Sequence, residues 1–399
     1  MGNNTIDKEK EESKIQKKGR KTRLEETEKK EKKQSKNSKN KSNNNNIVSN
    51  IFTALFSIGS IGIIIVLFLL YGPYSGFRNW LVTTAMTTMT HQYFATMFYD
   101  DDVISYIMDN NKVIESGEST DADAITVGSS TNTTTYKNEY ERAILERDPK
   151  NNDYKIIEIN EKDYDGYLAV VYDPSRIKTV ATENIGKSGQ YLTKMAKNND
   201  ALIAINGGGF DDPNFNSTGG SPLGVTMVDG EFVTQKSYGG SGGIIGFTEE
   251  NKLVLCKSSV SEAKKQGIRD CVTFGPFLIV NGKASGVLGN GGWGDAPRTA
   301  IAQRQDGIVL FLVLNGRTVS KKGADMDDLI KILQKYDAYN AANLDGGTSS
   351  VLVVGDTIVN DPIDSTGAHK TRPIATGFIL TKDDSDDSDH TLVAEKLSE

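Results

Sequence analysis

The chain has 399 residues, a formal net charge of −7, two cysteines and three histidines. Two cysteines exclude a disulfide-framework mini-protein and a zinc site built on repeated CxxC pairs, and three histidines leave little room for a multi-histidine metal centre. The 37% apolar content is sufficient for a sizeable core. The charge is uneven: residues 1–46 carry 15 Lys and Arg against 8 Asp and Glu, so this head is +7 and the remaining 353 residues are −14.

The basic head, residues 1–46, consists mainly of Lys, Glu, Asn and Ser with almost no large apolar side chains. Such a segment cannot bury enough apolar surface to offset its conformational entropy, so we expect a disordered tail. Its interleaved acidic residues and its lack of aromatic residues argue against nucleic acid as a partner.

An uncharged segment follows at residues 47–71, and Ile51–Leu70 within it is almost wholly apolar. Twenty helical residues span about 30 Å, the thickness of the hydrocarbon core of a bilayer. A cleaved signal peptide would have a shorter apolar region followed by a small-x-small cleavage site, which Leu70-Tyr71-Gly72-Pro73 does not offer. The segment therefore predicts an uncleaved, single-pass transmembrane anchor.

The basic side of a membrane span stays in the cytoplasm, so we expect a cytoplasmic N-terminus and an extracytoplasmic C-terminal part. The basic head adds some attraction to anionic membrane lipid. Residues 72–108, which include Trp80, Tyr93 and Phe94, predict a juxtamembrane helical segment. Residues 109–149 have the composition of a polar linker, residues 150–382 form the expected folded domain, and residues 383–399 are an acidic tail that we expect to be disordered.

The expected domain alternates short apolar runs with turn residues. Strands are predicted at 154–159 and 167–172. Asp-Gly or Asn-Gly pairs within residues 228–231, 280–283 and 305–308 predict hairpins, and Gly355-Asp356 predicts a fourth. Apolar residues on one face predict a helix over 326–336, and a shorter one is expected over 190–197. Antiparallel hairpins with two or three helices predict an α+β fold rather than a Rossmann arrangement.

Three segments of the domain combine glycines with polar groups at the ends of expected strands. Gly207–Gly209 follow the apolar run 201–205, and their N–H groups are suited to receive an anion, although a flexible turn is the favoured explanation of a lone Gly-Gly-Gly. Arg298 precedes a strand, where an arginine is usually a surface charge. Asp345, followed by Gly346 and Gly347, suits a carboxylate displayed at a strand end, and a hairpin turn is the alternative.

Taken together and in this order, the segments resemble the phosphodiester glycosidase family over roughly residues 150–382, and INGGGF and NLDGGTSS are the most specific parts. The resemblance is carried by INGGGF (205–210), GPFLIVNGK (275–283), PRTAIAQRQDG (297–307), Gly-Ala-Asp (323–325), NLDGGTSS (343–350) and Thr371-Arg372-Pro373. Family members often have His before Pro-Arg-Thr, where this chain has Ala296. The resemblance implies hydrolysis of the bond between a sugar's anomeric carbon and a phosphodiester, on cell-envelope or exopolysaccharide glycans.

This chemistry passes through an oxocarbenium-like state and expels a phosphate monoester, so the site needs a carboxylate and groups that hold phosphate. Asp345 is the candidate nucleophile or general base, and Asp211 is a second carboxylate. Arg298 is the first candidate for binding phosphate, because its planar fork can hold two oxygens. The remaining candidates for binding substrate are Asn206, Gly207, Gly208, Gly209, Thr299, Asn343, Gly346, Gly347, Ser349, Arg317 and Arg372.

Other features leave alternatives open. Cys256 and Cys271 form either a disulfide or two buried thiols. No ligand set demands a metal or other cofactor, although Asp211-Asp212 could hold a divalent cation weakly. Asn216-Ser217-Thr218 fits a glycosylation sequon. A non-catalytic glycan-binding or polysaccharide-assembly module is the alternative function, and it would not require Asp345 and Arg298 to converge.

Overall fold

The computed structural model describes residues 4–88, 91–128, 135–149, 151–211, 218–383 and 394–396. The chain divides into two compact units, Met1–Arg78 and Asn79–Glu399. Each unit is described by itself.

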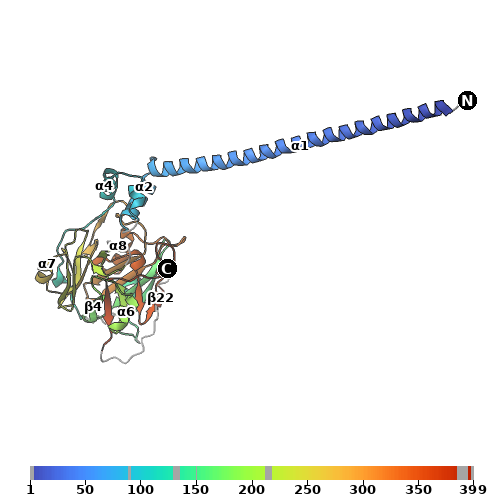
Figure 1. The fold of residues 1–399 in the computed structure, drawn as a ribbon. Helices are drawn as coiled ribbons and strands as arrows, with labels where there is room; N and C mark the ends of the chain where they lie inside the picture. The colour runs from blue at the N-terminus through green and yellow to red at the C-terminus, as the bar shows by residue number, and fades with distance from the viewer. Residues whose placement is uncertain are drawn as a thin grey trace. The chain divides into compact units, whose positions relative to one another are not determined.

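The first unit is dominated by one helix, α1 (Asn4–Tyr71), whose ribbon is uninterrupted (Figure 1). Within it, Ser49–Tyr71 is long and apolar enough to cross a membrane. The head that we expected to be disordered is helical in the structure. Lys, Glu and Gln lose little side-chain entropy in a helix, and Glu and Lys four residues apart attract each other, so the composition that prevents a packed core still allows a solvated helix.

The second unit is an α+β fold built on antiparallel sheets, as the sequence predicted. The main sheet has the order β14-β13-β18-β16-β17-β3-β2-β22. Its strands are β2 (Tyr154–Asn160), β3 (Asp165–Val171), β13 (Phe277–Val280), β14 (Lys283–Ala284), β16 (Arg298–Arg304), β17 (Val309–Leu314), β18 (Ala338–Asn343) and β22 (Ala394–Lys396). The pair β2–β22 is parallel, so part of the tail that we expected to be disordered is a strand.

Two five-stranded sheets complete the framework. One has the order β20-β19-β5-β21-β4, with β4 (Ile177–Ala181), β5 (Ala201–Asn206), β19 (Leu352–Val354), β20 (Thr357–Ile358) and β21 (Thr376–Thr381). The other has the order β11-β10-β12-β8-β9, with β8 (Val225–Val228), β9 (Glu231–Gln235), β10 (Gly243–Thr248), β11 (Leu253–Cys256) and β12 (Ile268–Phe274). Short pairs join β1 (Val113–Ile114) to β15 (Gly286–Val287) and β6 (Phe210–Asp211) to β7 (Ser221–Pro222).

Short helices precede the first strand or lie between later strands. They are α2 (Ser75–Met86), α3 (Tyr93–Thr96), α4 (Asp101–Asp109), α5 (Glu139–Leu145), α6 (Leu192–Asn198), α7 (Val260–Lys265) and α8 (Met326–Lys335), with 3-10 turns η1 (Ala122–Ala124), η2 (Pro174–Arg176) and η3 (Gly347–Ser349). The two predicted helices correspond to α6 and α8. Helix α8 begins with a capping box between Asp325 and Asp328, which satisfies free N–H groups of its first turn.

The four predicted hairpins are confirmed. In the β8–β9 turn, Asp229 and Gly230 have φ of 47° and 82°, and in the β13–β14 turn Asn281 and Gly282 have 53° and 74°. Both pairs therefore occupy the left-handed region that a type I′ turn requires. The pairs β16–β17 and β19–β20 form the other two hairpins.

The core consists of apolar clusters on the faces of these sheets. The largest cluster combines inward side chains of all three sheets, among them Phe311, Phe378 and Phe247. A second covers the other face of the main sheet with α8 and α5, and a third covers the β5–β21 sheet with α6. Cys256 and Cys271 lie in a fourth cluster as free thiols, and burial raises the pKa of each to about 12.

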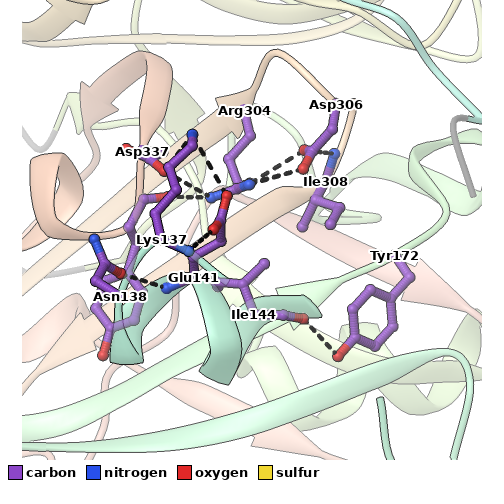
Figure 2. A network of polar contacts seen from close by, with 10 residues as sticks. Lys137, Asn138, Glu141, Ile144, Tyr172, Arg304, Asp306, Ile308 and Asp337 are labelled. Carbon is purple, nitrogen blue, oxygen red and sulfur yellow. Dashed lines mark hydrogen bonds and ion pairs between the residues drawn. The ribbon is translucent and has the colours of Figure 1, made fainter. Parts of the chain in front are cut away.

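Residues 109–149, which we expected to be a linker, pack on the folded unit. Figure 2 shows how α5 is held: the hydroxyl of Tyr172 donates to the carbonyl of Ile144 at 3.1 Å. Lys137, just before α5, lies 3.9 Å from Asp337, which Arg304 also approaches at 3.7 Å. Ile144 is fully buried. The linker prediction was wrong because this segment makes its contacts with residues far away in the sequence, which its own polar composition does not reveal.

The same segment is attached at further points upstream of α5. The backbone N–H of Phe277 donates to Glu115 Oε1 at 3.0 Å, and Thr120 exchanges hydrogen bonds with the backbone of Leu255. Burial raises the pKa of Glu115 above its usual value. Residues 113–128 and 137–145, which we call the strap, therefore belong to the folded unit rather than preceding it.

Candidate active site

Asp345 lies where the chain passes from one sheet to another. Strand β18 of the main sheet ends at Asn343, and after η3 the chain enters β19 of the neighbouring five-stranded sheet. The backbone N–H of Asp345 donates to the carbonyl of Gly207 at the end of β5, and that of Leu344 donates to the carbonyl of Thr299 in β16. The loop is thus hydrogen-bonded to both sheets.

The Asp345 carboxylate is held through one oxygen. Its Oδ2 accepts from Ser349 Oγ at 2.6 Å and from Arg372 Nη2 at 3.0 Å, while Arg372 Nε donates to the same Ser349 hydroxyl at 2.7 Å. Asp345 is 9% exposed. Among the residues that the structure describes, Oδ1 accepts no hydrogen bond, so the clamp fixes the orientation of the carboxylate and leaves one oxygen for chemistry.

Two arginines on the outer side of this loop are partly exposed. The Arg372 guanidinium lies 4.7 Å over the ring of Phe210. Arg317 has φ of +66° and donates from Nη1 to Thr348 Oγ1 and to the carbonyl of Ile363, both at 2.9 Å. Partial desolvation and the nearby charge of Arg372 lower the pKa of Arg317 from its usual value. Two positive groups are therefore gathered next to Asp345 in an otherwise acidic unit.

Arg298 lies on the inner side of the same loop and is 4% exposed. Its Nε donates to the carbonyl of Ala324 at 3.1 Å, and its Nη2 donates to the carbonyls of Trp293 and Gly294 at 2.7 and 2.5 Å. Burial lowers its pKa to about 10, an effect that the charge of Asp325 opposes most. A Cβ on Gly346 would lie 3.3 Å from Arg298 Nη1, so Arg298 packs against the residue that follows Asp345. Two of its three guanidinium nitrogens already bind main-chain oxygens.

Asn206 and Thr299, both predicted to bind sugar hydroxyls, are buried and bonded to each other. Thr299 Oγ1 donates to Asn206 Oδ1 at 2.7 Å, and the same oxygen accepts from the backbone N–H of Val351. Asn206 Nδ2 donates to the carbonyl of Asp345 at 2.6 Å. The Asn206 side chain therefore joins β5, β16, the start of β19 and the Asp345 loop, a structural role that occupies its oxygen and one of its two amide N–H donors.

The predicted anion cradle at Gly207–Gly209 is packed against the protein's own chain. The N–H groups of Gly207 and Gly208 donate to the carbonyl and to the hydroxyl of Thr376. A Cβ at any of the three would come within 2.5–2.6 Å of a neighbouring atom. These positions need glycine for close packing, and two of their amides are not free for an anion.

The other predicted binding residues line or support the loop. Gly347 has φ of +62°, and its N–H donates to the carbonyl of Pro297. A Cβ on Gly346 would meet Arg298 Nη1 at 3.3 Å. Asn343 is fully buried, its Nδ2 donates to the carbonyl of Gly275, and its Oδ1 has no partner among the described residues.

Asp211, the predicted second carboxylate, is exposed, whereas its neighbour Phe210 is buried beside Arg372. Alternation along β6 therefore brings the ring and not the carboxylate to this arginine. Asp212 and the sequon residues Asn216 and Ser217 lie outside the described residues, so the weak cation site and the glycosylation site stay predictions. Within the described ranges, no group of three or more His, Cys, Asp or Glu residues could hold a metal ion.

Sequence reasoning missed Phe210, Trp293, Thr348 and Thr376 as parts of the site. Trp293 lies 5.8 Å from the Arg298 guanidinium and packs edge-on against Phe274. Phe210 is the last residue of the INGGGF segment, so the motif could have indicated that Phe210 belongs to the site. Thr376 carries no local signal, because its partners Gly207 and Gly208 are far away in the sequence. Trp293 lies only five residues before Arg298.

Residues 199–381 match the sequence model of the phosphodiester glycosidase family. The matched range is 183 of the 399 residues, so just under half of the chain is similar to this family. The resemblance predicted from INGGGF and NLDGGTSS is confirmed, and both segments lie inside the matched range.

Two curated relatives resemble this chain over part of their length. The SPbeta prophage-derived uncharacterized protein YomE of Bacillus subtilis is 27% identical over 181 residues, which cover 43% of this chain and 27% of that protein. The N-acetylglucosamine-1-phosphodiester alpha-N-acetylglucosaminidase of Bos taurus is 34% identical over 67 residues, 17% of this chain and 12% of that enzyme. The chain therefore spans about a quarter of the first relative and an eighth of the second.

Solved structures are also similar to part of this chain. The zebrafish N-acetylglucosamine-1-phosphodiester alpha-N-acetylglucosaminidase catalytic domain aligns with a TM-score of 0.48 and 21% identity, covering 58% of this chain and 83% of that one. A hypothetical protein from Synechocystis aligns with a TM-score of 0.40 and 16% identity, covering 57% and 61%.

Proposed function

We propose that the chain hydrolyses the bond between a sugar's anomeric carbon and a phosphodiester oxygen. The observation that carries the proposal is the clamp on Asp345: one carboxylate oxygen is fixed by Ser349 and Arg372, while Arg317 bonds Thr348 of the same loop. The match of residues 199–381 to the phosphodiester glycosidase family model supports the same reaction.

Asp345 supplies the carboxylate that this chemistry needs. The bond to the phosphate oxygen breaks as positive charge develops at the anomeric carbon, and a nearby carboxylate stabilises that charge, either as nucleophile or as base for water. Water finally contributes OH to the anomeric carbon and a proton to the medium or the phosphate. The departing oxygen keeps the electron pair of the broken bond and leaves as a phosphate monoester.

Arg372 and Arg317 are the proposed phosphate ligands. Both are more exposed than Arg298, and they approach the Asp345 loop from the side of Thr348 and Phe210. A departing phosphate monoester is already a good leaving group, so charge neutralisation by arginine serves better than a general acid. Arg298, with its fork bound to carbonyls, acts as a positioning residue for the loop.

The substrate and the setting of the reaction are part of the proposal. The bovine relative is named for N-acetylglucosamine-1-phosphodiesters, which makes these the first substrates to try. The apolar stretch Ser49–Tyr71 fits a single-pass anchor that holds the enzyme at the membrane, with the N-terminus cytoplasmic and the catalytic domain acting on envelope or exopolysaccharide glycans outside.

The substitution Asp345→Asn tests the proposal. It keeps the shape and the Ser349 hydrogen bond but removes the charge, so we expect kcat on an N-acetylglucosamine-1-phosphodiester to fall about 10³-fold. The matched control is Asp356→Asn, an exposed turn residue, which leaves kcat unchanged. Near-normal turnover by a folded Asp345→Asn protein would remove Asp345 from the mechanism.

The alternative function, a non-catalytic glycan-binding module, makes a different prediction. The wild-type protein would then bind glycans without releasing a phosphate monoester, and Asp345→Asn would alter affinity alone. The pairing of Arg372 with Asp345, next to the Arg317 that bonds Thr348 of the same loop, favours the enzyme, because a site for neutral glycans has no need of two cations beside one carboxylate.

A further inference from the structure

The segment between α1 and the strap carries a concentration of exposed aromatic and apolar side chains. Among the described residues of the second unit, ten large apolar side chains are exposed, and five of them fall within residues 80–106. These five, each at least 42% exposed, are Trp80, Tyr93, Phe94, Met97 and Tyr106. The other five are scattered, at Ile114, Ile185, Tyr191, Leu288 and Val319. Single exposed apolar residues are ordinary, whereas a concentration of them marks a surface that contacts something apolar.

We call Trp80, Tyr93, Phe94, Met97 and Tyr106 the aromatic face. Trp80 lies on α2, Tyr93 and Phe94 begin α3, Met97 follows α3, and Tyr106 lies on α4. The rings of Tyr93 and Phe94 are 4.2 Å apart, and α3 packs against α4. Figure 1 shows α2 and α4 at the end of the second unit that is away from α6. The aromatic face therefore belongs to one end of the second unit.

The composition of this segment points to a partner that is not recognised by charge. Residues 79–99 contain no Lys, Arg, Asp or Glu. The acidic residues that follow serve α4: Asp100 Oδ1 accepts from the backbone N–H of Val103 at 3.0 Å. Asp101 and Asp102 lie in the first turn, where negative charge favours a helix. Tryptophan and tyrosine are enriched where a membrane meets water, because the ring is apolar and its polar group stays hydrated.

The chain itself keeps the aromatic face near the end of the apolar span. Ser49–Tyr71 is long and apolar enough to cross a membrane, and only Gly72–Tyr74 separate α1 from α2. The four steps from Tyr71 to Ser75 extend at most about 14 Å, and the five helical steps from Ser75 to Trp80 add about 8 Å. A bilayer that contained the span would therefore lie within reach of Trp80.

The remaining side of α2 is fixed to the second unit. Val82, Thr83 and Ala85 are buried. Thr83 Oγ1 accepts from Asn290 Nδ2 at 2.8 Å, and the backbone N–H of Asn290 donates to Asn111 Oδ1 at 3.1 Å. Asn111 follows α4, so the turn at Asn290 is bonded to both helices. The aromatic face is thus held in a set orientation on the second unit.

We propose that the aromatic face lies in the headgroup layer of the bilayer that α1 crosses, so that the second unit rests on the membrane surface. The partner is the phospholipid interface, which offers both apolar and polar contacts. This inference rests on the membrane anchor of the proposed function and is independent of the proposed hydrolysis. It gives the chain a second lipid contact in addition to the span.

The test uses tryptophan fluorescence, because the chain has only two tryptophans, Trp80 and Trp293. Trp293→Phe leaves Trp80 as the reporter. The matched control places Tyr191→Trp in a chain that carries Trp80→Phe and Trp293→Phe, since Tyr191 is similarly exposed and precedes α6. Each full-length variant is reconstituted in phosphatidylcholine vesicles, with or without bromine near the headgroup end of the acyl chains. We expect brominated lipid to quench about half of the Trp80 emission and almost none of the control emission.

Two further substitutions distinguish docking of the face from tethering by the span. Met97→Asp and Tyr106→Asp, each made in the Trp293→Phe chain, put a charge on the aromatic face at well-exposed positions. We expect each to reduce the quenching of Trp80 by about twofold or more, because a carboxylate is disfavoured in the lipid interface. The matched control is Tyr191→Asp in the same chain, which should leave the quenching unchanged. Two separate positions keep the test valid if one variant folds poorly.

The outcomes separate the proposals without any measurement of turnover. If the wild-type chain does not enter vesicles, the membrane anchor is wrong and the docked face is wrong with it. If the chain enters but Trp80 is quenched no more than the Tyr191→Trp control, only the docked face is wrong. Quenching that both charged variants leave unchanged would also overturn it, because the span alone would then bring Trp80 to the lipid.

A second copy of the chain is the competing occupant of this face. In that case lipid bromine would not quench Trp80, whereas a rising protein concentration would shield it from a water-soluble quencher, and the lipid contact would be overturned. Quenching of Trp80 by brominated lipid that falls in Met97→Asp and Tyr106→Asp, and not in Tyr191→Asp, supports the docked face.

Discussion

At the scale of single residues, the arginines near Asp345 have different structural roles, although nothing in the sequence distinguishes them. Arg298 is buried and donates to three main-chain carbonyls from different parts of the chain. Arg372 is partly exposed and donates to Ser349 and Asp345. Burial and the type of hydrogen-bond partner show that Arg298 holds the loop, whereas Arg372 orients the carboxylate. A sequence motif contains neither kind of information.

This difference predicts opposite effects of substitution. Arg298→Met leaves three carbonyls without a donor, so we expect the free energy of unfolding to fall by about 3 kcal/mol, measured by urea denaturation. Arg372→Lys keeps the charge but loses the double contact, so kcat/KM should fall about 10- to 100-fold while stability changes little. If Arg298→Met had the same free energy of unfolding as wild type and lost only phosphate affinity, the sequence-based prediction that Arg298 binds phosphate would be correct.

The sequence predicted that the residues of the Asp345 loop lie together, but not which residues support the loop. NLDGGTSS placed Asp345, Gly346 and Ser349 together because they are neighbours in the chain. Ser349 was expected to bind sugar, and the structure uses it to clamp the carboxylate instead. The partners that decide this, Arg372 and the Asn206 side chain, lie 27 and 139 residues away from Asp345, beyond the reach of local patterns.

At the scale of elements, local chemistry explains which predictions succeeded. Asp229-Gly230 and Asn281-Gly282 formed the expected turns because positive φ is a property of the turn itself. The prediction of a linker at residues 109–149 was wrong because the hydrogen bonds of this segment, such as that between Thr120 and Leu255, join residues 135 positions apart. The prediction of a disordered basic head differs from the structure for another reason: a segment with few apolar residues was expected to be disordered, although its residues are good helix formers.

The packing of α5 predicts that the strap contributes to stability. Ile144→Ala removes a fully buried side chain, so the free energy of unfolding should fall by about 2–5 kcal/mol in thermal or urea denaturation of the full chain. The matched control is Ile114→Ala in β1, where the side chain is 50% exposed and we expect a change below about 0.5 kcal/mol. If the two substitutions had equal effects on the free energy of unfolding, the interpretation of residues 109–149 as a linker would be correct after all.

At the scale of the whole molecule, the two units differ in what surrounds their apolar side chains. Ser49–Tyr71 is only 6% buried within the protein, whereas the apolar side chains of Asn79–Glu399 fill its clusters. A span this exposed needs an apolar environment from outside the chain, and a bilayer supplies one.

Membrane association is the prediction at this scale. We expect the full chain to stay with carbonate-washed membranes, and Ile63→Lys with Ile64→Lys to release it, because each charge at the centre of a span costs about 2.5–3.5 kcal/mol. Ile114→Lys, an exposed position in the second unit, is the matched control and should not alter retention. N-terminal sequencing distinguishes an anchor from a cleaved signal sequence, and protease digestion of intact cells reports which side carries the second unit.

The position of Asn206 has a consequence for how the proposed activity would be lost. Its side chain ties Asp345 to strands from two separate sheets, so the placement of the carboxylate depends on the angle at which those sheets meet. A small shift of one sheet relative to the other, caused for example by a shortened core side chain far from the loop, would move Asp345 Oδ1 without unfolding any strand. On heating, activity should then be lost before secondary structure, so turnover would report a disturbed core more sensitively than secondary structure does.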